Sequence, residues 1–196
     1  MTISRIINDV FNSCSYIIKQ GPYSWLVDCG DTERIVPLIS GNLCGVMLTH
    51  THFDHIYGLN RLLNVYPDVP ILTNAAGRVG LMSDKVNLSR YHEEPFVIDR
   101  PGNIRIVEDG EVLNLFDDVK AHAVFTPGHA PDCVTWVMKV AVFTGDSFIP
   151  GTKTVTILPH ADKALAASSE VRIRDLIRQR EVYPGHSVSI DEKEMI

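Results

Sequence analysis

Residues 49–55 read Thr-His-Thr-His-Phe-Asp-His and concentrate imidazole and carboxylate groups in one short stretch. Side chains alternate between faces in an extended chain, so His50 and His52 point the same way and could bind one metal ion. Asp54 and His55 follow, where a turn can carry them toward a second ion. Zn, Fe and Mn all accept such nitrogen and oxygen ligands. The stretch therefore indicates a metal site, with a solvated polar loop as the alternative.

The same construction returns three more times along the chain. An apolar run ends and a ligand-type residue follows in "AVFTPGH", "VAVFTGD" and "EVYPGH". These motifs add His129, Asp146 and His186, and a glycine precedes each of them. Glycine permits the tight backbone that aims a short side chain inward, and loops on a rigid scaffold are where functional groups usually lie. A repeated pattern of this kind favours a metal centre over chance solvated loops.

The size and chemistry of the set narrow the type of site. The candidate ligands outnumber the three or four protein groups that a single zinc ion takes, and they suit two ions if one carboxylate bridges them. The set contains no thiolate, which argues against a structural cysteine-rich zinc site. His92 and His160 are interpreted as solvated, although His160 could line a pocket, and His122 as half-buried.

Apolar runs and turns predict the elements that must position these groups. Residues 13–31 predict a hairpin that turns at Gly21-Pro22, and the continuous apolar run 43–49 predicts a strand covered on both faces. Further strands are expected within 69–73, 104–115 (turning at Asp109-Gly110), 119–125, 133–146 and 181–184. Helices are expected within 32–40 (shortened or kinked by Pro37), 56–67, 75–82 and 162–180 (interrupted near Ser168-Ser169). This order favours two sheets with helices packed outside them.

Bulk properties limit the class of protein. The 196 residues suit one domain spanning 1–196, and a net charge of −6 argues against a nucleic-acid-binding surface. The 4 cysteines form no C-x-x-C pair, which favours reduced thiols in a cytoplasmic protein. The N-terminus lacks the pattern of a signal peptide, and no apolar run approaches the roughly 20 residues that span a bilayer. We expect a small-molecule substrate and no membrane partner, and a homodimer stays open.

These motifs resemble those of the metallo-β-lactamase superfamily. "THTHFDH" fits its T-H-x-H-x-D-H motif, and "TPGHA", "TGDS" and "YPGH" fit its later motifs in the right order. The resemblance runs from about residue 10 to 188, nearly the whole chain. It implies an αββα sandwich, in which two mixed sheets face each other, helices cover both outer faces and the metals lie at one edge.

Position by position, the resemblance also implies a ligand set. One metal would be held by His50, His52 and His129. A second would be held by Asp54, His55 and His186, with Asp146 as the bridge. The implied cofactors are two divalent ions, with zinc favoured over Fe or Mn, roughly 3.5–4 Å apart and able to generate a hydroxide nucleophile near neutral pH. Asp54 is the candidate catalytic residue, which would orient or shuttle a proton.

Within the superfamily, "TPGHAPDCVTWVM" is most similar to the hydroxyacylglutathione hydrolases (glyoxalase II). The chain departs from them by ending about 10 residues after His186, without their C-terminal helical domain. It also departs after Asp146, where "SFIPGTKTVTILPHADK" replaces their G-R-x-D pattern, and at Cys133, where they often carry a hydroxyl residue. We predict a dinuclear hydrolase of a small thioester, ester or lactone-like substrate. Lys153 and His160 are candidates for holding an anionic substrate.

Other functions use related sites. A phosphodiesterase or nuclease of the same fold would use the same metals. A mononuclear non-haem iron persulfide dioxygenase would hold one Fe on His50, His129 and Asp146. A scaffold with a vestigial site is disfavoured because the ligand set is intact. Antibiotic hydrolysis is disfavoured because true β-lactamases of this fold generally lack the bridging aspartate that Asp146 would supply.

Overall fold

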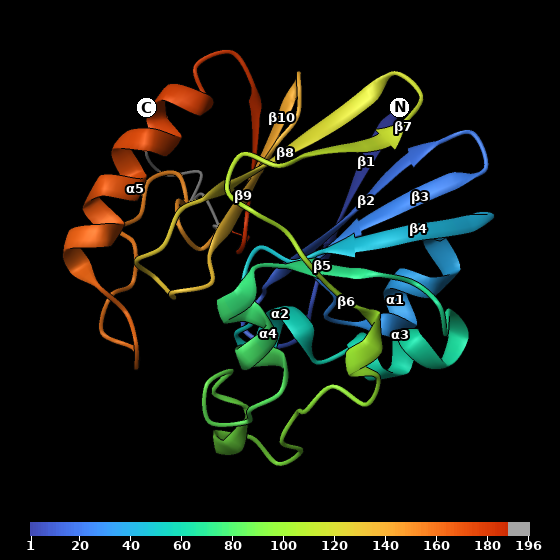
Figure 1. Ribbon diagram of the computed structural model, residues 1–196, viewed down its shortest axis with the longest axis horizontal. Coiled ribbons are helices and arrows are strands. Elements are labelled where there is room, and N and C mark those ends of the chain that lie inside the picture. The colour runs from blue at the N-terminus through green and yellow to red at the C-terminus, as the bar shows by residue number, and fades with distance from the viewer. Residues whose placement is uncertain (188–196) are drawn as a thin grey trace, which may run out of the picture.

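The computed structural model describes residues 1–187, which form two β-sheets that pack face to face (Figure 1). The 6-stranded sheet comprises β1 (Thr2–Ile7), β2 (Cys14–Gln20), β3 (Tyr23–Val27), β4 (Asn42–Met47), β5 (Ile71–Thr73) and β6 (Ile104–Ile106). The 5-stranded sheet comprises β7 (Val112–Phe116), β8 (Val119–Phe125), β9 (Val134–Val137), β10 (Ala141–Gly145) and β11 (Glu181–Pro184). The two mixed sheets are those that the sequence predicts.

Strand pairing shows how the chain moves through the sheets. The order in the first sheet is β1-β2-β3-β4-β5-β6, antiparallel from β1 to β3 and parallel from β3 to β6. The second sheet has the order β11-β10-β9-β8-β7, with only the β10–β11 pair parallel. The predicted hairpin over 13–31 is confirmed as β2 and β3. The turn at Asp109-Gly110 instead lies between β6 and β7, so it carries the chain from one sheet to the other.

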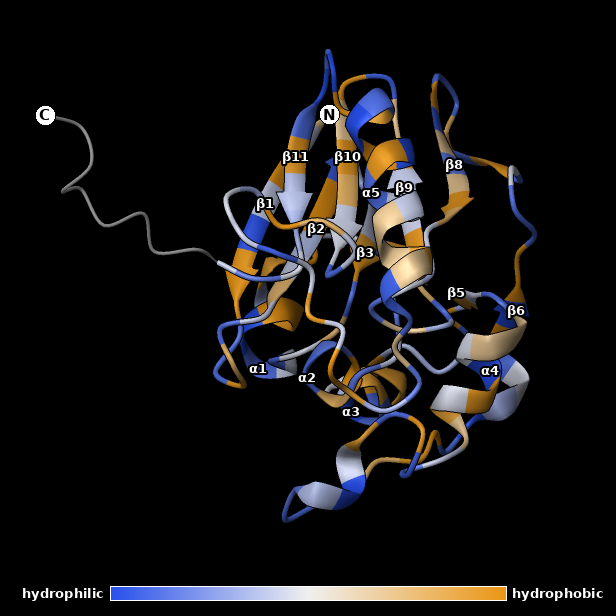
Figure 2. Cartoon of the chain, turned by 90° about the vertical axis from the view of Figure 1, so that its left-hand side faces the viewer, coloured by the Kyte–Doolittle hydropathy of each residue, from blue (hydrophilic) through white to orange (hydrophobic). Residues whose placement is uncertain are grey.

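Helices cover the outer face of each sheet. Against the first sheet lie α1 (Thr32–Ile35), α2 (Phe53–Ile56), α3 (Leu59–Val65) and α4 (Ala75–Leu81), with 3₁₀ turns at Val36–Leu38, Ser89–Tyr91 and Pro101–Asn103. Against the second lies α5 (Lys163–Leu176), which crosses in front of β9 and β10 in Figure 2. None of the helices formed by residues 1–187 combines the length and the apolar character needed to cross a membrane.

Two helix predictions have different outcomes. α1 ends at Ile35 and continues as the 3₁₀ turn that contains Pro37, so the expected shortening is confirmed. The expected interruption of α5 near Ser168-Ser169 is wrong, because the helix is continuous from Lys163 to Leu176. The Ser169 hydroxyl donates a hydrogen bond to the carbonyl of Pro127 at 2.6 Å, so this serine anchors the helix to the β8 loop.

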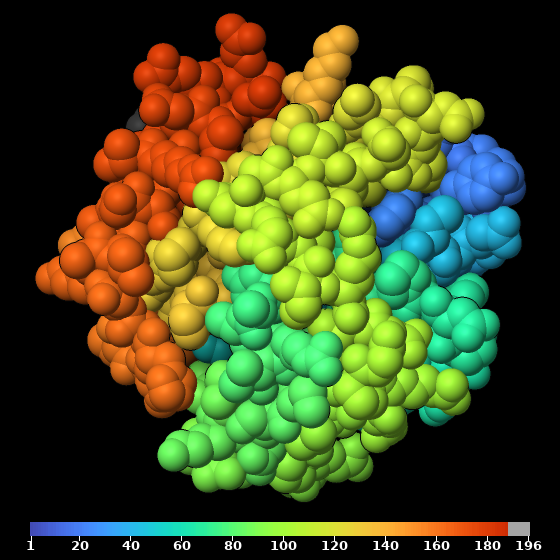
Figure 3. Space-filling model, viewed as in Figure 1, coloured from blue at the N-terminus to red at the C-terminus, as the bar shows by residue number. Residues whose placement is uncertain are grey.

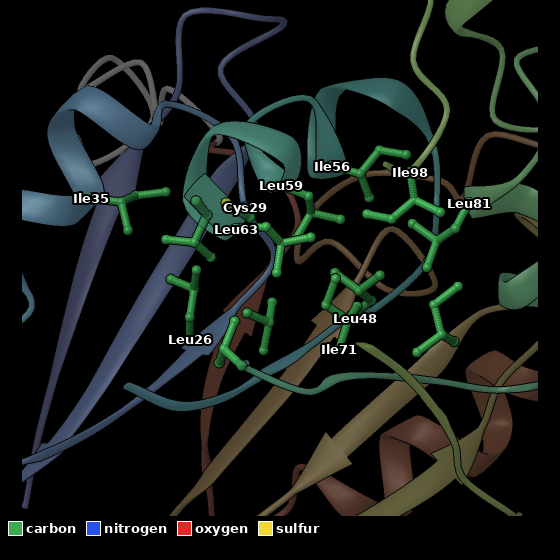
Figure 4. Packing of buried hydrophobic residues seen from close by; sticks show 14 of the residues in the cluster. Leu26, Cys29, Ile35, Leu48, Ile56, Leu59, Leu63, Ile71, Leu81 and Ile98 are labelled. Atoms are coloured by element: carbon green, nitrogen blue, oxygen red, sulfur yellow. The ribbon is translucent and has the colours of Figure 1, made fainter. Parts of the chain in front are cut away.

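Three apolar layers separate the four layers of secondary structure. Ile17, Leu26 and Ile71 point from the first sheet toward the helices, where they pack with the side chains shown in Figure 4. Their strand neighbours, such as Ile18, Val27 and Leu72, point toward the second sheet. Val124, Val137 and Val142 form the third layer, beneath α5. Strands buried on both faces explain the continuous apolar runs in the sequence. The αββα prediction is therefore confirmed.

Polar atoms of buried aromatic residues connect the two sheets. The indole of Trp25 on β3 donates to the carbonyl of Leu115 on β7 at 2.9 Å. The indole of Trp136 on β9 donates to the carbonyl of Leu48, just after β4, at 2.9 Å. The hydroxyl of Tyr16 on β2 donates to the carbonyl of Pro184 on β11 at 2.6 Å. Because they are directional, these bonds fix how the sheets sit on each other.

We predict that Trp136→Phe destabilises the protein by at least about 1–3 kcal/mol, because it removes the only donated hydrogen of that side chain and leaves a buried carbonyl without it. The smaller ring also leaves space in a packed core, which adds to the loss. Urea unfolding measures the change in the free energy of unfolding. Tyr23→Phe, at an exposed aromatic residue on β3, is the matched control and should stay within about 0.5 kcal/mol. Equal stability of Trp136→Phe and the native protein would contradict the role of this bond.

Candidate metal centre

The predicted ligands meet at one edge of the sandwich, where strands from both sheets end. His50 and His52 follow β4, and α2 carries Asp54 and His55. The second sheet supplies its three residues just after the C-terminal ends of β8, β10 and β11: His129, Asp146 and His186. β8, β10 and β11 run in the same direction, so their ends lie at the same edge. The strand-end pattern in the sequence thus corresponds to one place in the fold.

The side chains form overlapping groups of metal-ligand atoms. In each group, one atom per residue lies within 4.8 Å of the others. The groups are His50, His52 and His129; His50, His55 and Asp146; and Asp54, His55 and His186. The Asp146 carboxylate lies between the sets, with its oxygens 3.5 Å from Nε2 of His55, 3.5 Å from Nε2 of His129 and 3.2 Å from Nε2 of His186. The geometry gathers the candidate metal ligands around Asp146.

Several ligand atoms of the cluster are buried without any hydrogen-bond partner. They are Nε2 of His50, Nε2 of His55 and Oδ1 of Asp146. Leaving such a group unpaired in the interior costs about 1–3 kcal/mol. A cation bound among these atoms would satisfy all of them at once. The donor set of imidazole and carboxylate fits Zn, Fe or Mn. The residues present therefore fit a metal centre.

A second ring of contacts orients the imidazoles. Nδ1 of His55 lies 2.9 Å from a carboxylate oxygen of Asp28. Nδ1 of His129 lies 2.9 Å from the carbonyl of Val155, and Nδ1 of His186 lies 2.9 Å from the carbonyl of Phe11. Each of these acceptors requires the proton on Nδ1, which leaves Nε2 free to bind a metal. His52 differs, since its Nδ1 is the atom that faces Nε2 of His129, at 2.9 Å.

Asp28 is a functional residue that our sequence prediction missed. It follows β3 in a left-handed conformation with φ 54° and is almost fully buried. Its carboxylate accepts hydrogen bonds from the Thr49 amide and the Thr49 hydroxyl, both at 2.7 Å, besides the contact with His55. Asp28 therefore holds both Thr49, at the start of the 49–55 stretch, and the candidate ligand His55. The signal was present, because "WLVDCG" is another apolar strand that ends in an aspartate.

Charge differs between the two halves of the cluster. Burial and the neighbouring histidines lower the pKa of His50, and burial with His129 lowers the pKa of His52 to about 4. Burial opposes ionisation of His186, yet its contacts with Asp146 and Asp54 outweigh this and raise its pKa to about 10. His50 and His52 are therefore neutral near pH 7, whereas His186 carries an additional proton. A metal bound by His186 would replace that proton.

Glycines give the ligand turns their shape at two points. Gly128 precedes His129 with φ 141°, and a Cβ there would lie 2.2 Å from the Ala166 amide nitrogen. A Cβ on Gly185, which precedes His186, would lie 2.0 Å from Oδ1 of Asp146. A side chain at either position would displace a ligand turn. The role that the sequence analysis assigns to these glycines therefore has a steric basis.

A pocket of about 270 Å³ opens over the cluster. Apart from cluster residues, it is lined by Phe11, Phe53, Leu88, Tyr91, His92, Val155 and Leu158. The prediction that His92 is simply solvated is wrong, because its half-buried ring packs 4.2 Å from the ring of Phe53. The sequence pattern had no signal for most of these walls, since all but Phe53, which begins α2, come from loops and a 3₁₀ turn that the fold brings together.

Two predicted substrate contacts lie elsewhere. Lys153 lines a separate hollow beside α5, together with Phe148 and Arg174. His160 is exposed, with φ 67°. Neither lines the pocket over the cluster, and their part in substrate binding stays a prediction. In Figure 3, a narrow gap separates the orange segment that precedes α5 from the green segment around α4.

We predict that Asp28→Asn lowers metal affinity about 10- to 100-fold, because one amide cannot accept all the hydrogen bonds that the carboxylate accepts. Asparagine tolerates the left-handed backbone, so the chain should still fold. Competition with a chelator of known affinity measures the change. Asp31→Asn is the matched control, since Asp31 is a nearby carboxylate that accepts from the Tyr57 hydroxyl rather than from a ligand. An unchanged affinity in Asp28→Asn would refute this role.

The chain is similar in sequence to known proteins. A family model described as the metallo-beta-lactamase superfamily matches residues 9–186. An atrochrysone carboxyl ACP thioesterase of Cryptosporiopsis sp. is 29% identical over 189 residues, which cover 91% of this chain and 50% of that protein. A probable metallo-hydrolase of Streptococcus pyogenes serotype M6 is 28% identical, covering 96% of this chain and 85% of that protein. A hydroxyacylglutathione hydrolase of Hydrogenovibrio crunogenus is 26% identical, covering 83% of this chain and 53% of that protein. The chain spans about half the length of the first and third of these relatives.

Solved structures show the same fold. The B3 metallo-beta-lactamase BLEG-1 superposes with a TM-score of 0.86 at 21% identity, covering 95% of this chain and 92% of that one. A protein crystallised in a di-iron-bound form, TTHA1623, gives a TM-score of 0.80 at 24% identity, covering 94% of this chain and 92% of that one. At such identities the likeness concerns the fold alone. With the family match over nearly its whole length, the chain belongs to the metallo-β-lactamase superfamily.

Proposed function

We propose that the chain is a dinuclear metal-dependent hydrolase that acts on a small thioester, ester or lactone-like substrate. The observation that carries the proposal is the position of Asp146, whose carboxylate lies between two sets of ligand atoms. A single ion needs no more than three or four of these residues. The number of ligands and the central carboxylate support a pair of ions.

The residues would divide between two ions. His50, His52 and His129 would hold one, and Asp54, His55 and His186 would hold the other, with Asp146 shared. A pair of divalent ions held there, for which we favour zinc over Fe or Mn, would supply a hydroxide nucleophile near neutral pH and polarise the carbonyl oxygen of the substrate. The chain's part is to fix these ligands in a partly enclosed pocket, with imidazoles oriented by Asp28, Val155 and Phe11.

Asp54 is the residue to which we assign proton handling. Its carboxylate lines the pocket, and its Oδ2 lies 3.3 Å from Nε2 of both His55 and His186. Although burial favours the neutral acid, the neighbouring His55 and His186 hold the pKa of Asp54 well below its usual range. An ionised carboxylate at the pocket wall can orient an attacking water and pass its proton to the leaving group.

The names of the relatives support an acyl substrate. They include a thioesterase, a hydroxyacylglutathione hydrolase and a probable metallo-hydrolase. Because the chain spans only about half the length of two of these proteins, their substrates are not carried over. We propose the shared chemistry, hydrolysis of a small activated acyl compound by a protein acting in the cytoplasm.

Metal analysis combined with a substrate panel tests the proposal. We expect two metal ions per chain after loading, and turnover of small thioesters or esters that is lost with a chelator. Turnover of phosphodiesters alone would replace the proposal with a phosphodiesterase. One Fe per chain with oxygen uptake on a persulfide would replace it with a dioxygenase.

We predict that Asp54→Asn removes most of the turnover, by about 100-fold or more given the usual contribution of general acid–base groups. It should also weaken the second metal, since a carboxylate ligand becomes an amide. Metal content and kcat are measured on the same loaded sample. Asp68→Asn, on the exposed turn after α3, is the control for the loss of one negative charge. Near-normal turnover of Asp54→Asn with two bound metals would defeat both roles.

A further inference from the structure

The walls of the pocket over the cluster are apolar. They comprise Phe11, together with Leu88 and Tyr91 from the segment after α4, and Val155 and Leu158 from the segment after β10. His92 joins the aromatic residues, with its ring 5.9 Å from that of Phe11 and 4.2 Å from that of Phe53. A substrate that reaches the cluster must pass between these surfaces.

Charge in the pocket comes from the cluster itself. Among residues 1–187, no lysine or arginine lines the pocket, and its carboxylates are those of Asp54 and Asp146. Lys153 lies in the separate hollow beside α5. A negatively charged substrate arm that points away from the cluster would therefore lose its hydration between these apolar walls without a lysine or arginine to pair with, which is costly. An uncharged arm has no such loss.

The exposed aromatic rim points to the same conclusion. The side chains of Phe11 and Tyr91 are 68% and 75% exposed, although both border the pocket. Large apolar side chains grouped at the mouth of a cavity are typical of a surface that a ligand covers. The pocket volume of about 270 Å³ lies just below the roughly 300–1,000 Å³ of pockets for drug-sized ligands. It suits one compact group joined to the reacting atom.

We infer that the pocket selects substrates whose acyl group, the part bonded to the reacting carbonyl, is an uncharged aromatic or aliphatic group held among Phe11, Tyr91, Val155 and Leu158. This specificity rests on the proposed hydrolase function and narrows it. It disfavours acyl groups that carry a carboxylate or phosphate. It also assigns substrate contact to residues outside the metal cluster.

The first experiment compares acyl groups on one neutral thiol. Phenylacetyl and succinyl thioesters of N-acetylcysteamine differ in whether the acyl end is an aromatic ring or a carboxylate. With each kcat/KM divided by the rate of uncatalysed hydrolysis, we expect the phenylacetyl compound to be favoured by about tenfold or more. One misplaced group in a pocket typically changes discrimination by roughly 10–200-fold. Equal use of the two compounds, or a preference for the succinyl compound, overturns the inference.

The second experiment changes residues of the pocket walls and measures whether the substrate preference changes with them. Phe11→Ala and Tyr91→Ala should each reduce kcat/KM about threefold to tenfold more for the phenylacetyl thioester than for an acetyl thioester, whose small acyl group touches less of the walls. Tyr91→Lys should shift the preference toward the succinyl thioester, because it places a cation at the rim. Val171→Ala, which removes an apolar side chain that is 67% exposed on α5, is the matched control and should leave both ratios unchanged. Identical ratios in Tyr91→Lys and Val171→Ala contradict the inference.

A binding measurement separates this inference from the proposed function. Thioether analogues that carry a phenethyl or a carboxypropyl group cannot be hydrolysed, and calorimetry on the metal-loaded protein gives their affinities. We expect the phenethyl analogue to bind more tightly, and Tyr91→Ala to reduce the difference. Such a preference in the absence of any esterase or thioesterase turnover would support the pocket and refute the hydrolase. Turnover with no preference between the analogues would do the reverse.

Discussion

The rest of the structure depends on one constraint, which is that imidazoles and carboxylates must be held together in the interior with some of their metal-ligand atoms left unpaired. Nε2 of His50, Nε2 of His55 and Oδ1 of Asp146 have no hydrogen-bond partner. Left alone, such groups would turn toward water or toward any available partner. The protein prevents this by fixing the opposite side of each ring, as Asp28 does for His55 and the Phe11 carbonyl does for His186. Binding capacity is therefore created by the surrounding contacts.

Both sheets of the sandwich are needed to meet that constraint, because each supplies only part of the cluster. β4 and α2 supply one part of the cluster, and the ends of β8, β10 and β11 supply the other. The distance between the parts is set where the sheets touch, and the bond from Trp136 to the carbonyl of Leu48 lies just before the 49–55 stretch. Cys14 adds a backbone bond to the carbonyl of Gly185 at 2.7 Å, next to His186. The packing between the sheets therefore also sets the distances between the candidate ligands.

Sequence patterns predicted the features that depend only on neighbouring residues, such as the strand ends and their ligands. A buried strand, a glycine turn and a ligand are neighbours along the chain, so the strand ends and their His and Asp residues could be found in order. The turn at Asp109-Gly110 was found, but its sequence does not say whether the next strand joins the same sheet. The segment 83–98 carries Leu88, Tyr91 and His92 to the pocket without regular structure. Its position depends in part on distant partners, such as the side chain of Asn60, which donates to the carbonyl of Val97, and in part on Asn87, which donates to the carbonyls of Gly80 and Phe96. Sequence periodicity carries no signal for such contacts.

Two residues, Phe11 and Val155, contact both the pocket and the ligand cluster, the pocket with a side chain and the cluster with a backbone carbonyl. The Phe11 carbonyl accepts from His186 while its side chain lines the pocket, and the Val155 carbonyl accepts from His129 while its side chain also lines the pocket. A group that fills the pocket presses on the same two residues that aim the ligands. His129 and His186 both approach Oδ2 of Asp146, at 3.5 and 3.2 Å. Under the proposed function, a group held between the apolar walls would therefore contact the same residues whose carbonyls orient His129 and His186.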